Sequence, residues 1–531
     1  MPRRHFSSHL APLAGLLLLL AGCTGVGEAA SGDDEADRLA IDEPEWSAHV
    51  QPYLAARCGT CHGGESPAGG LDVTSWEALI GGSDHGEALI AYDPNFSLMV
   101  ELGHRLPDEL PEEYRWRPAT RFETFREDHR LAPEEVEFLS RWIRAGARGP
   151  AGEVPFADAE GRVFVAVQDA GMVSVLDIDR LVVARNVHFD DYGGRRAIPH
   201  DTDYEPDGSA WYVTLIGAQR VVKLDAATNE VLADLNVAAE NPTYKPGMLA
   251  LDANSDRLYL SRSISDLSGG RSIMAIDRST MEGEEILVPY TRPHPIGLTR
   301  DGEYILSGSL ADNLVAAIHA RTFDLASPLR VDGTQTPLMH YDVAPDGATA
   351  VITGQFSNLL YILDVTDPEN LSVIHAVQVG QEPWYPAYSA DGSYVIVPNH
   401  RTNDVSIVDV TAGRVVHTIT DERFAMPHGA VASHDGRYIF ISNSNLTHDE
   451  APGHGAHGHQ EVEEEMGGFG ERAAPYHPRF PLDRSGDGRA DNLRTGHVTV
   501  IDAHTFEVIK VLELEEFPSG MSLWQAGHPH R

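Results

Sequence analysis

Short apolar stretches broken by turns at a regular spacing dominate the chain from Val154 onward. Turn-forming pairs recur roughly every 45 residues, at Glu160-Gly161, Asp207-Gly208, Asn254-Ser255, Asp301-Gly302, Asp346-Gly347, Asp391-Gly392 and Asp435-Gly436. A strand-like run follows each pair, as at residues 210–213 and 438–441, and a second run ends in a phrase such as Val-Ser-Ile-Val-Asp at residues 405–409. Four short strands per unit at this period predict a β-propeller, and the seven pairs predict seven blades.

The two ends of this repeat region predict how the ring closes. Most units carry an inner-strand phrase that opens with proline, but the first unit lacks one. Residues 517–524 supply an unpartnered copy of that phrase near the C terminus. We therefore expect the last segment to complete the first blade, which leaves no open sheet edge.

Helical spacing replaces strand alternation ahead of the repeats. One predicted helix runs into residue 58 and has its apolar residues at Trp46, Val50, Tyr53 and Leu54. A second predicted helix begins at Pro133, with Glu134 and Glu135 near its positive end, and stops at Gly146. Its apolar face consists of Val136, Leu139, Trp142 and Ile143.

The first helix leads into Cys58-Gly59-Thr60-Cys61-His62, the signature of covalent c-type haem attachment. In such a site Cys58 and Cys61 form the two thioethers and His62 is the proximal iron ligand. The chain has only three cysteines, so Cys23 is the one left over. The motif predicts haem c as the cofactor.

Two family resemblances extend this prediction. Residues 49–54, 58–63, 69–71 and 142–147 closely resemble the cytochrome c domain of planctomycete-type multidomain proteins, which implies a small all-α class I cytochrome c domain over residues 44–149. Residues 150–531 resemble the YVTN or surface-layer family of seven-bladed propellers, which implies an all-β domain and says little about function.

The chain departs from the cytochrome family at the sixth iron ligand. Family members usually place Met-Pro-Pro ahead of the last helix, and Leu106-Pro107 stands there instead. His104 or Met99 is the favoured substitute and His129 is a third candidate, although Met99 in a helix-like stretch also suits a core position. An imidazole in place of a thioether would lower the potential.

A second candidate site consists of histidines at equivalent repeat positions: His200, His294 and His428, with His340 one residue off register. Such positions form a ring around the channel of a propeller, which suits a second metal or a haem-facing site. The alternative interpretation is a family-specific turn in which each imidazole bonds a neighbouring blade.

An insertion over residues 445–495 interrupts the last unit. It holds an acidic run and the histidines His448, His454, His457 and His459, which favour either a solvated loop or a transition-metal site. Asp483, Ser485, Asp487 and Asp491 match ligand positions of a calcium loop. Arg494 stands where the bidentate Glu of an EF-hand belongs, so a full EF-hand is excluded.

The N terminus predicts export. Residues 1–22 have the basic start and the short apolar core of a signal peptide. Leu20-Ala21-Gly22-Cys23 resembles the bacterial lipobox, which implies cleavage before Cys23 and acylation of that cysteine. Residues 23–43 are predicted to form a flexible tether. We expect a lipid-anchored protein of the cell envelope, facing the periplasm or on the outer membrane.

Composition narrows the functional classes. The formal net charge of -40 disfavours nucleic acid and favours a basic redox partner. No hydrolase elbow, P-loop or dinucleotide fingerprint stands in a supporting context. The leading hypothesis is a lipid-anchored electron carrier whose propeller binds a partner or ligand. The alternatives are an oxidoreductase with a second centre on the propeller histidines, similar in outline to nitrite or nitrous oxide reductases, and a propeller that is a passive scaffold.

Overall fold

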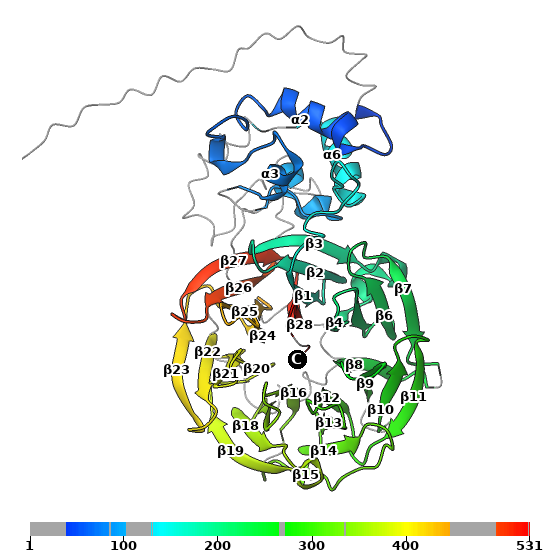
Figure 1. Cartoon of the computed structure of the whole chain (residues 1–531), viewed down its shortest axis with the longest axis vertical. Helices are drawn as coiled ribbons and strands as arrows, with labels where there is room; N and C mark the ends of the chain where they lie inside the picture. The colour runs from blue at the N-terminus through cyan, green and yellow to red at the C-terminus, as the bar shows by residue number, and fades with distance from the viewer. Residues whose placement is uncertain are drawn as a thin grey trace, which may run out of the picture. The chain divides into compact units, whose positions relative to one another are not determined.

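The computed structural model describes residues 39–83, 87–101, 129, 131–239, 241–264, 271–333, 336–445, 495–528 and 530. Over these ranges a helical region, within residues 39–149, precedes seven four-stranded sheets arranged as a propeller (Figure 1). Several sequence predictions lie outside the described residues: the signal peptide, Cys23, His104, and the insertion with its four histidines and the calcium-loop residues Asp483, Ser485, Asp487 and Asp491.

The helical region contains the two predicted helices and several shorter turns. The elements are η1 (Trp46–Val50), α2 (Gln51–Arg57), η2 (Ala68–Gly70), α3 (Trp76–Ile80), η3 (Pro94–Phe96), α4 (Leu98–Glu101) and α6 (Pro133–Arg144). The predicted first helix is confirmed as η1 followed directly by α2, which ends just before Cys58. The predicted second helix is confirmed as α6, with Pro133 in its first turn and Gly146 after its end at a φ of 100°. None of the helices in the described ranges is long and apolar enough to span a bilayer.

Aromatic side chains hold the first and last helices together. The rings of Trp46 and Trp142 lie 5.6 Å apart, and those of Tyr53 and Phe138 lie 5.3 Å apart, edge to face. Such pairs add about 1 kcal/mol beyond the area that they bury. The segment that carries Cys58 is thereby fixed on α6.

Each blade runs from an inner to an outer strand. Blade one contains β28 (Pro518–Gln525), β1 (Gly161–Val167), β2 (Met172–Asp177) and β3 (Val182–His188). Blade two contains β4 (Pro199–Tyr204), β5 (Ala210–Leu215), β6 (Arg220–Asp225) and β7 (Val231–Asn236). Blade three contains β8 (Tyr244–Leu251), β9 (Arg257–Ile264), β10 (Ser272–Asp277) and β11 (Glu282–Leu287). Blade four contains β12 (Pro293–Leu298), β13 (Tyr304–Ser309), β14 (Leu314–His319) and β15 (Leu329–Arg330).

The remaining three blades follow the same plan. Blade five contains β16 (Leu338–Val343), β17 (Thr349–Gly354), β18 (Leu359–Asp364) and β19 (Ser372–Gln378). Blade six contains β20 (Ala387–Tyr388), β21 (Tyr394–Asn399), β22 (Asp404–Asp409) and β23 (Arg414–Thr420). Blade seven contains β24 (Pro427–Ala432), β25 (Tyr438–Asn443), β26 (Gly496–Asp502) and β27 (Val508–Leu514).

The ring closes as predicted from the sequence. Strand β28, from the C-terminal end of the chain, pairs antiparallel with β1 and becomes the inner strand of blade one (Figure 1). The register places Val163 opposite Leu523. Both side chains are buried in one apolar cluster, so the two ends of the repeat region share a core.

The repeated turn pairs contain glycine because the backbone at that position has a positive φ. Gly208, Gly302, Gly347, Gly392 and Gly436 all have φ values of 72–73°. This left-handed conformation is open to glycine at little cost. The Asp-Gly pairs of the sequence therefore mark one turn that recurs in five blades.

Candidate haem site and the centre of the propeller

The predicted attachment motif forms a compact turn at the end of α2. The backbone N–H of Cys58 donates to Leu54 O at 2.8 Å, and those of Cys61 and His62 both donate to Cys58 O, at 3.2 and 2.9 Å. Cys58 is half-buried and Cys61 is exposed. One short turn thus carries both thiols and the imidazole.

Backbone contacts orient the His62 ring. Its Nδ1 lies 3.1 Å from Ala68 O, and because a carbonyl only accepts, Nδ1 carries the proton. The Nε2 atom of a neutral ring then holds the lone pair that a metal needs. The backbone oxygen of His62 accepts from Val73 N–H at 2.9 Å, which fixes the main chain of the ligand as well.

The side chains at this turn fit haem c. In c-type haem each of the two vinyl groups forms a thioether with a cysteine thiol, and the iron is bound by a histidine nitrogen. Cys58, Cys61 and His62 supply these groups in the order of the motif. Burial raises the pKa of the Cys58 thiol, which opposes a role as a free thiolate nucleophile. A haem bound here would supply reversible one-electron chemistry at its iron.

Of the two sixth-ligand candidates within the described residues, Met99 and His129, the structure brings His129 to the His62 ring. The Nε2 atoms of His62 and His129 lie 3.4 Å apart, and their ring centroids lie 5.6 Å apart. Met99 lies on α4, where its backbone N–H donates to Ala88 O at 3.0 Å, and it is half-buried. The sequence analysis favoured His104 or Met99 over His129. Sequence alone gives no direct information on which distant residue faces His62.

Glu135 is a residue whose role the sequence did not reveal beyond its place near a helix N terminus. Its carboxylate accepts hydrogen bonds from Tyr53 Oη at 2.9 Å and Arg57 Nε at 3.1 Å, both on α2. It also accepts from Ala132 N–H at 2.6 Å, at the start of its own helix. Burial, followed by the charge of Glu135, raises the pKa of Tyr53 far above its ordinary value, so the phenol stays protonated and donating. One carboxylate therefore ties α2 to the beginning of α6.

Residues 87–97 attach the helical region to the outer strand of blade one. Ala91 forms a parallel bridge with Arg185 on β3, and Asn186 N–H donates to Ala91 O at 3.1 Å. Six of the seven residues of β3 are buried, whereas none of β7, the outer strand of blade two, is buried. Ile90 and Phe96 pack in the same apolar cluster as the core of blade one. This segment thus covers a strand edge that is open in the next blade.

A buried carboxylate, Asp93, is the polar centre of that contact. Its Oδ2 accepts from Asn186 Nδ2 at 2.9 Å and lies 3.6 Å from His188 Nε2, and its Oδ1 accepts from Phe96 N–H at 3.1 Å. Burial alone would raise the pKa of Asp93, but these hydrogen bonds and the His188 charge hold it below the ordinary value. Burial alone would lower the pKa of His188. The hydrogen bond and charge of Asp93 outweigh burial, so the pKa of His188 is raised. Asp93 and His188 therefore form a charged contact between residues 87–97 and blade one.

The four predicted propeller histidines all lie on inner strands. They are His200 on β4, His294 on β12, His340 on β16 and His428 on β24. His200 and His294 meet, with their Nε2 atoms 3.2 Å apart. His340 and His428 each pack on Tyr385, with ring centroids 4.8 Å away in both cases, and the His294 ring lies 6.5 Å from the same Tyr385.

The contacts of His200 and His294 fit the alternative interpretation, in which each imidazole bonds a neighbouring blade. His200 Nδ1 lies 3.1 Å from Gln168 Nε2, and His294 Nδ1 lies 3.0 Å from Met339 O, on the neighbouring blade. Burial lowers the pKa of His294 well below its ordinary value and that of His340 to about 4, so both rings are neutral at pH 7. Among the residues that the structure describes, no three His, Cys, Asp or Glu side chains are grouped so as to hold a metal ion.

Trp384 stands at the same repeat position as His200, His294 and His428, and Tyr385 at that of His340, but both were missed because the search of these positions considered histidines alone. Trp384 lies 4.2 Å, between ring centroids, from His428. Burial raises the pKa of Tyr385 well above its ordinary value. The centre therefore combines an aromatic cluster with the neutral rings of His294 and His340.

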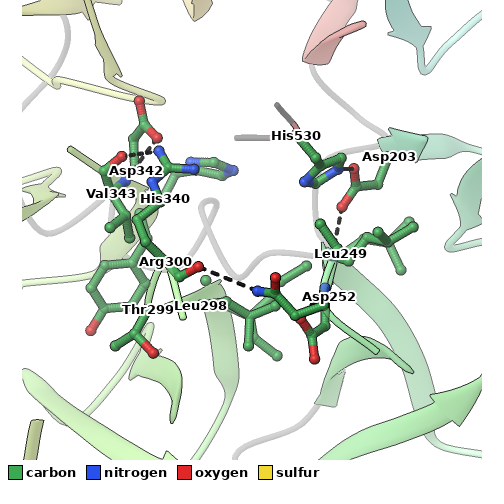
Figure 2. A pocket seen from close by; sticks show the side chains of 17 residues that line it. Asp203, Leu249, Asp252, Leu298, Thr299, Arg300, His340, Asp342, Val343 and His530 are labelled. Carbon is green, nitrogen blue, oxygen red and sulfur yellow. Dashed lines mark hydrogen bonds and ion pairs between the residues drawn. The ribbon is translucent and has the colours of Figure 1, made fainter. Parts of the chain in front are cut away.

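A pocket of about 160 Å³ opens between the inner strands of blades two to five (Figure 2). Asp203, Asp252, Arg300, Asp342 and His340 line it, together with His530 from the end of the chain. His530 Nε2 lies 2.7 Å from Asp203 Oδ1, so His530 reaches an inner strand on the far side of the pocket from Asp342 (Figure 2).

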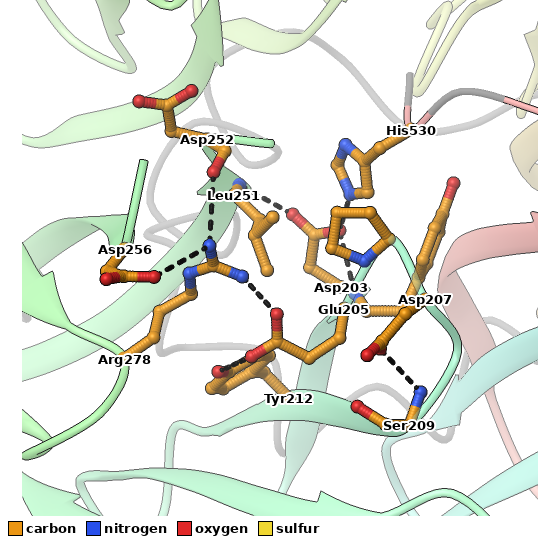
Figure 3. A network of polar contacts seen from close by, with 12 residues as sticks. Asp203, Glu205, Asp207, Ser209, Tyr212, Leu251, Asp252, Asp256, Arg278 and His530 are labelled. Carbon is orange, nitrogen blue, oxygen red and sulfur yellow. Dashed lines mark hydrogen bonds and ion pairs between the residues drawn. The ribbon is translucent and has the colours of Figure 1, made fainter. Parts of the chain in front are cut away.

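Asp203 also belongs to a network that links blade two to blade three. Its Oδ2 accepts from Leu251 N–H at 2.8 Å, while Arg278 of blade three forms an ion pair with Glu205 of blade two (Figure 3). In blade five, Asp342 Oδ2 accepts in the same way from Tyr388 N–H, at 2.7 Å. The inner-strand carboxylates thus join successive blades and line the pocket at the same time.

A comparison with protein families agrees with the predicted identity of the helical region. Residues 58–109 match the family model described as planctomycete cytochrome c. No curated protein matches the chain. Among solved structures, the β-propeller domain of Cps50 (Swd1) from Myceliophteria thermophila is 14% identical, with a TM-score of 0.44, covering 54% of this chain and 90% of that one. The chain therefore carries a planctomycete-type cytochrome c domain, a haem electron carrier, ahead of a seven-bladed β-propeller.

Proposed function

We propose that this protein is an exported, lipid-anchored c-type cytochrome that passes single electrons to or from a partner docked on its propeller. The observation that carries the proposal is the turn after α2, where Cys58, Cys61 and His62 follow one another and Ala68 O orients the imidazole. Thioethers at the two cysteines hold the haem, His62 ligates its iron, and the packing of α2 on α6 keeps the ligand in place.

The anchor and location rest on the N-terminal sequence. The signal-like residues 1–22 and the lipobox-like phrase that ends at Cys23 support acylation of Cys23. The Gly-, Ala- and acid-rich residues that follow support a flexible tether. The cytochrome is then held near a membrane surface of the cell envelope, facing the periplasm or on the outer membrane.

The role of the propeller rests on charge and on attachment. A net charge of -40 favours association with a basic redox protein, at a rate that falls as salt screens the attraction. The contact of residues 87–97 with β3 supports a fixed orientation of the haem relative to blade one. The repeat phrases favour a YVTN or surface-layer type of propeller.

The test is haem attachment in the full chain, produced with a cytochrome c maturation system. We expect one haem that stays bound after denaturation, and its loss in the double variant Cys58→Ala/Cys61→Ala. The matched control, Cys23→Ser, keeps the haem but leaves the membrane fraction. A folded wild-type chain without covalent haem would contradict the proposal.

A metal count on the same protein separates this function from its main rival, an oxidoreductase with a second centre on the propeller histidines. We expect one iron per chain and no other metal. A second metal that is lost in His200→Ala or His428→Ala would favour the rival instead.

A further inference from the structure

We propose that His129 is the sixth ligand of the haem iron, so that the iron lies between two imidazoles. This inference rests on the proposed haem attachment at Cys58, Cys61 and His62. It concerns the other side of the iron, where the chain lacks the methionine phrase of its family.

The geometry of the two rings is the first argument. Nδ1 of His62 is engaged by Ala68 O, so its Nε2 is the nitrogen available to a metal, and that atom faces Nε2 of His129 at 3.4 Å. Two metal–imidazole bonds of about 2 Å each would hold such atoms about 4 Å apart. The two nitrogens need to separate by only about 0.6 Å to admit a metal between them.

A simple hydrogen bond between the rings explains the same contact less well. N–H donors lie about 2.7–3.2 Å from their acceptors, and 3.4 Å exceeds that range. The ring planes are inclined by 51°, so the two imidazoles are not stacked either. Opposed nitrogens that are too distant for a good hydrogen bond and slightly too close for a shared metal suit a pair of axial ligands.

The hydrogen bonds of Glu135 hold the segments that carry His62 and His129. The α2 helix leads directly to Cys58 and His62, and α6 begins at Pro133, four residues after His129. Glu135 joins these two helices through Tyr53 and also bonds the backbone N–H of Ala132, three residues from His129. The same carboxylate therefore fixes the approach of both candidate ligands.

Two imidazole ligands define how the haem is used. Replacing the thioether of ordinary cytochromes c by imidazole lowers the reduction potential. An iron with both axial positions filled by protein has no open position for a substrate, which favours electron transfer over ligand chemistry. The inference therefore makes the domain a low-potential carrier.

The experiment uses the full holoprotein and reads the iron ligands directly. Near-infrared magnetic circular dichroism of the ferric wild type distinguishes two nitrogen ligands from a nitrogen and a thioether. We expect the two-nitrogen signature in the wild type. In His129→Ala we expect a high-spin ferric spectrum, CO binding by the reduced protein, and return of the low-spin spectrum with added imidazole. In His129→Met we expect a higher midpoint potential.

Three control variants complete the test. Met99→Leu, His104→Ala and His49→Ala should each keep the wild-type spectrum and the CO-insensitive reduced state. A thioether signature in the wild type, or a wild-type spectrum in His129→Ala, would overturn the assignment, as would loss of the spectrum in His104→Ala alone. Should His129→Ala fail to fold, the wild-type signature together with the His104→Ala result decides. Covalent haem with another sixth ligand refutes only this inference, whereas absence of covalent haem refutes the proposed function.

Discussion

Single residues decide the chemistry of this molecule at two positions, the half-buried His62 and the fully buried His497. His62 presents Nε2 because Ala68 O engages the other ring nitrogen. His497, in blade seven, is fully buried and its Nε2 lies 2.7 Å from Arg423 O. Burial makes the charged form of such a ring costly, so the pKa of His497 falls to about 4 from the ordinary 6.5.

This shift predicts a pH dependence of stability. The pKa of His497 is lower in the folded than in the unfolded chain, so its contribution is complete above about pH 6.5 and is lost as pH falls toward about 4. A shift of this size corresponds to about 3 kcal/mol of unfolding free energy. We expect His497→Gln to flatten the decline in unfolding free energy between these pH values, measured by urea denaturation.

The control is the exposed His504 in the same blade. His504→Gln should leave the pH profile of the wild type unchanged. An equal slope in wild type and His497→Gln would show that this histidine does not drive the acid sensitivity.

The residue scale also shows where sequence information ends. The attachment motif is readable because its five residues are contiguous. His129 lies 67 positions beyond His62, and nothing in its polar surroundings indicates which side chain it will face. Tyr385 and Trp384 were missed because histidines alone were considered at their repeat positions, and their meeting with His428 depends on how neighbouring blades pack.

At the scale of elements, local signals were sufficient for the two predicted helices and for the repeated strands, but not for shorter helices such as α3. Pro133 and Gly146 bracket α6, and the Asp-Gly turns mark successive blades. The contact between elements is carried by Glu135, whose sequence position suggested only a favourable interaction with the helix N terminus. The pairing of its carboxylate with Tyr53 and Arg57 depends on the approach of α2, which sequence spacing does not encode.

A substitution at Glu135 tests this link. Glu135→Gln weakens three hydrogen bonds around a nearly buried carboxylate, so we expect a loss of about 2 kcal/mol in unfolding free energy. The measurement is thermal denaturation followed by haem absorbance, which reports the domain that contains α2 and α6. Glu137→Gln, which alters only an exposed pair with Arg141, should change stability by less than about 0.5 kcal/mol. Equal effects of the two variants would argue against the link.

At the scale of the whole molecule, the propeller and its closure followed from the repeat, whereas the attachment of the cytochrome domain to it did not. The missing inner-strand phrase of the first unit correctly indicated that β28 completes blade one. The covering of β3 by residues 87–97 pairs Ala91 with Arg185, and neither residue belongs to a recognisable motif. Such an interface is set by surface complementarity between two folded parts.

Asp93 provides a test of that attachment. Asp93→Ala leaves the fully buried Asn186 amide without its acceptor, at a cost of about 2 kcal/mol. We expect faster proteolytic cleavage between the cytochrome domain and blade one under native conditions, with the haem spectrum unchanged. Asp191→Ala, at an exposed position near β3, should be cleaved at the wild-type rate. Wild-type cleavage of Asp93→Ala would mean that this carboxylate does not hold the two parts together.

The central claim is that the chain is a one-electron carrier with a single covalently bound haem. Its most direct test is a potentiometric titration of the purified full chain, with the haem spectrum followed at each potential. The account predicts one reversible transition with a slope of about 59 mV per tenfold change in the ratio of oxidised to reduced protein, as expected for one electron. It also predicts that the reduced protein does not bind CO. A second transition, or CO binding by the reduced wild type, would contradict it.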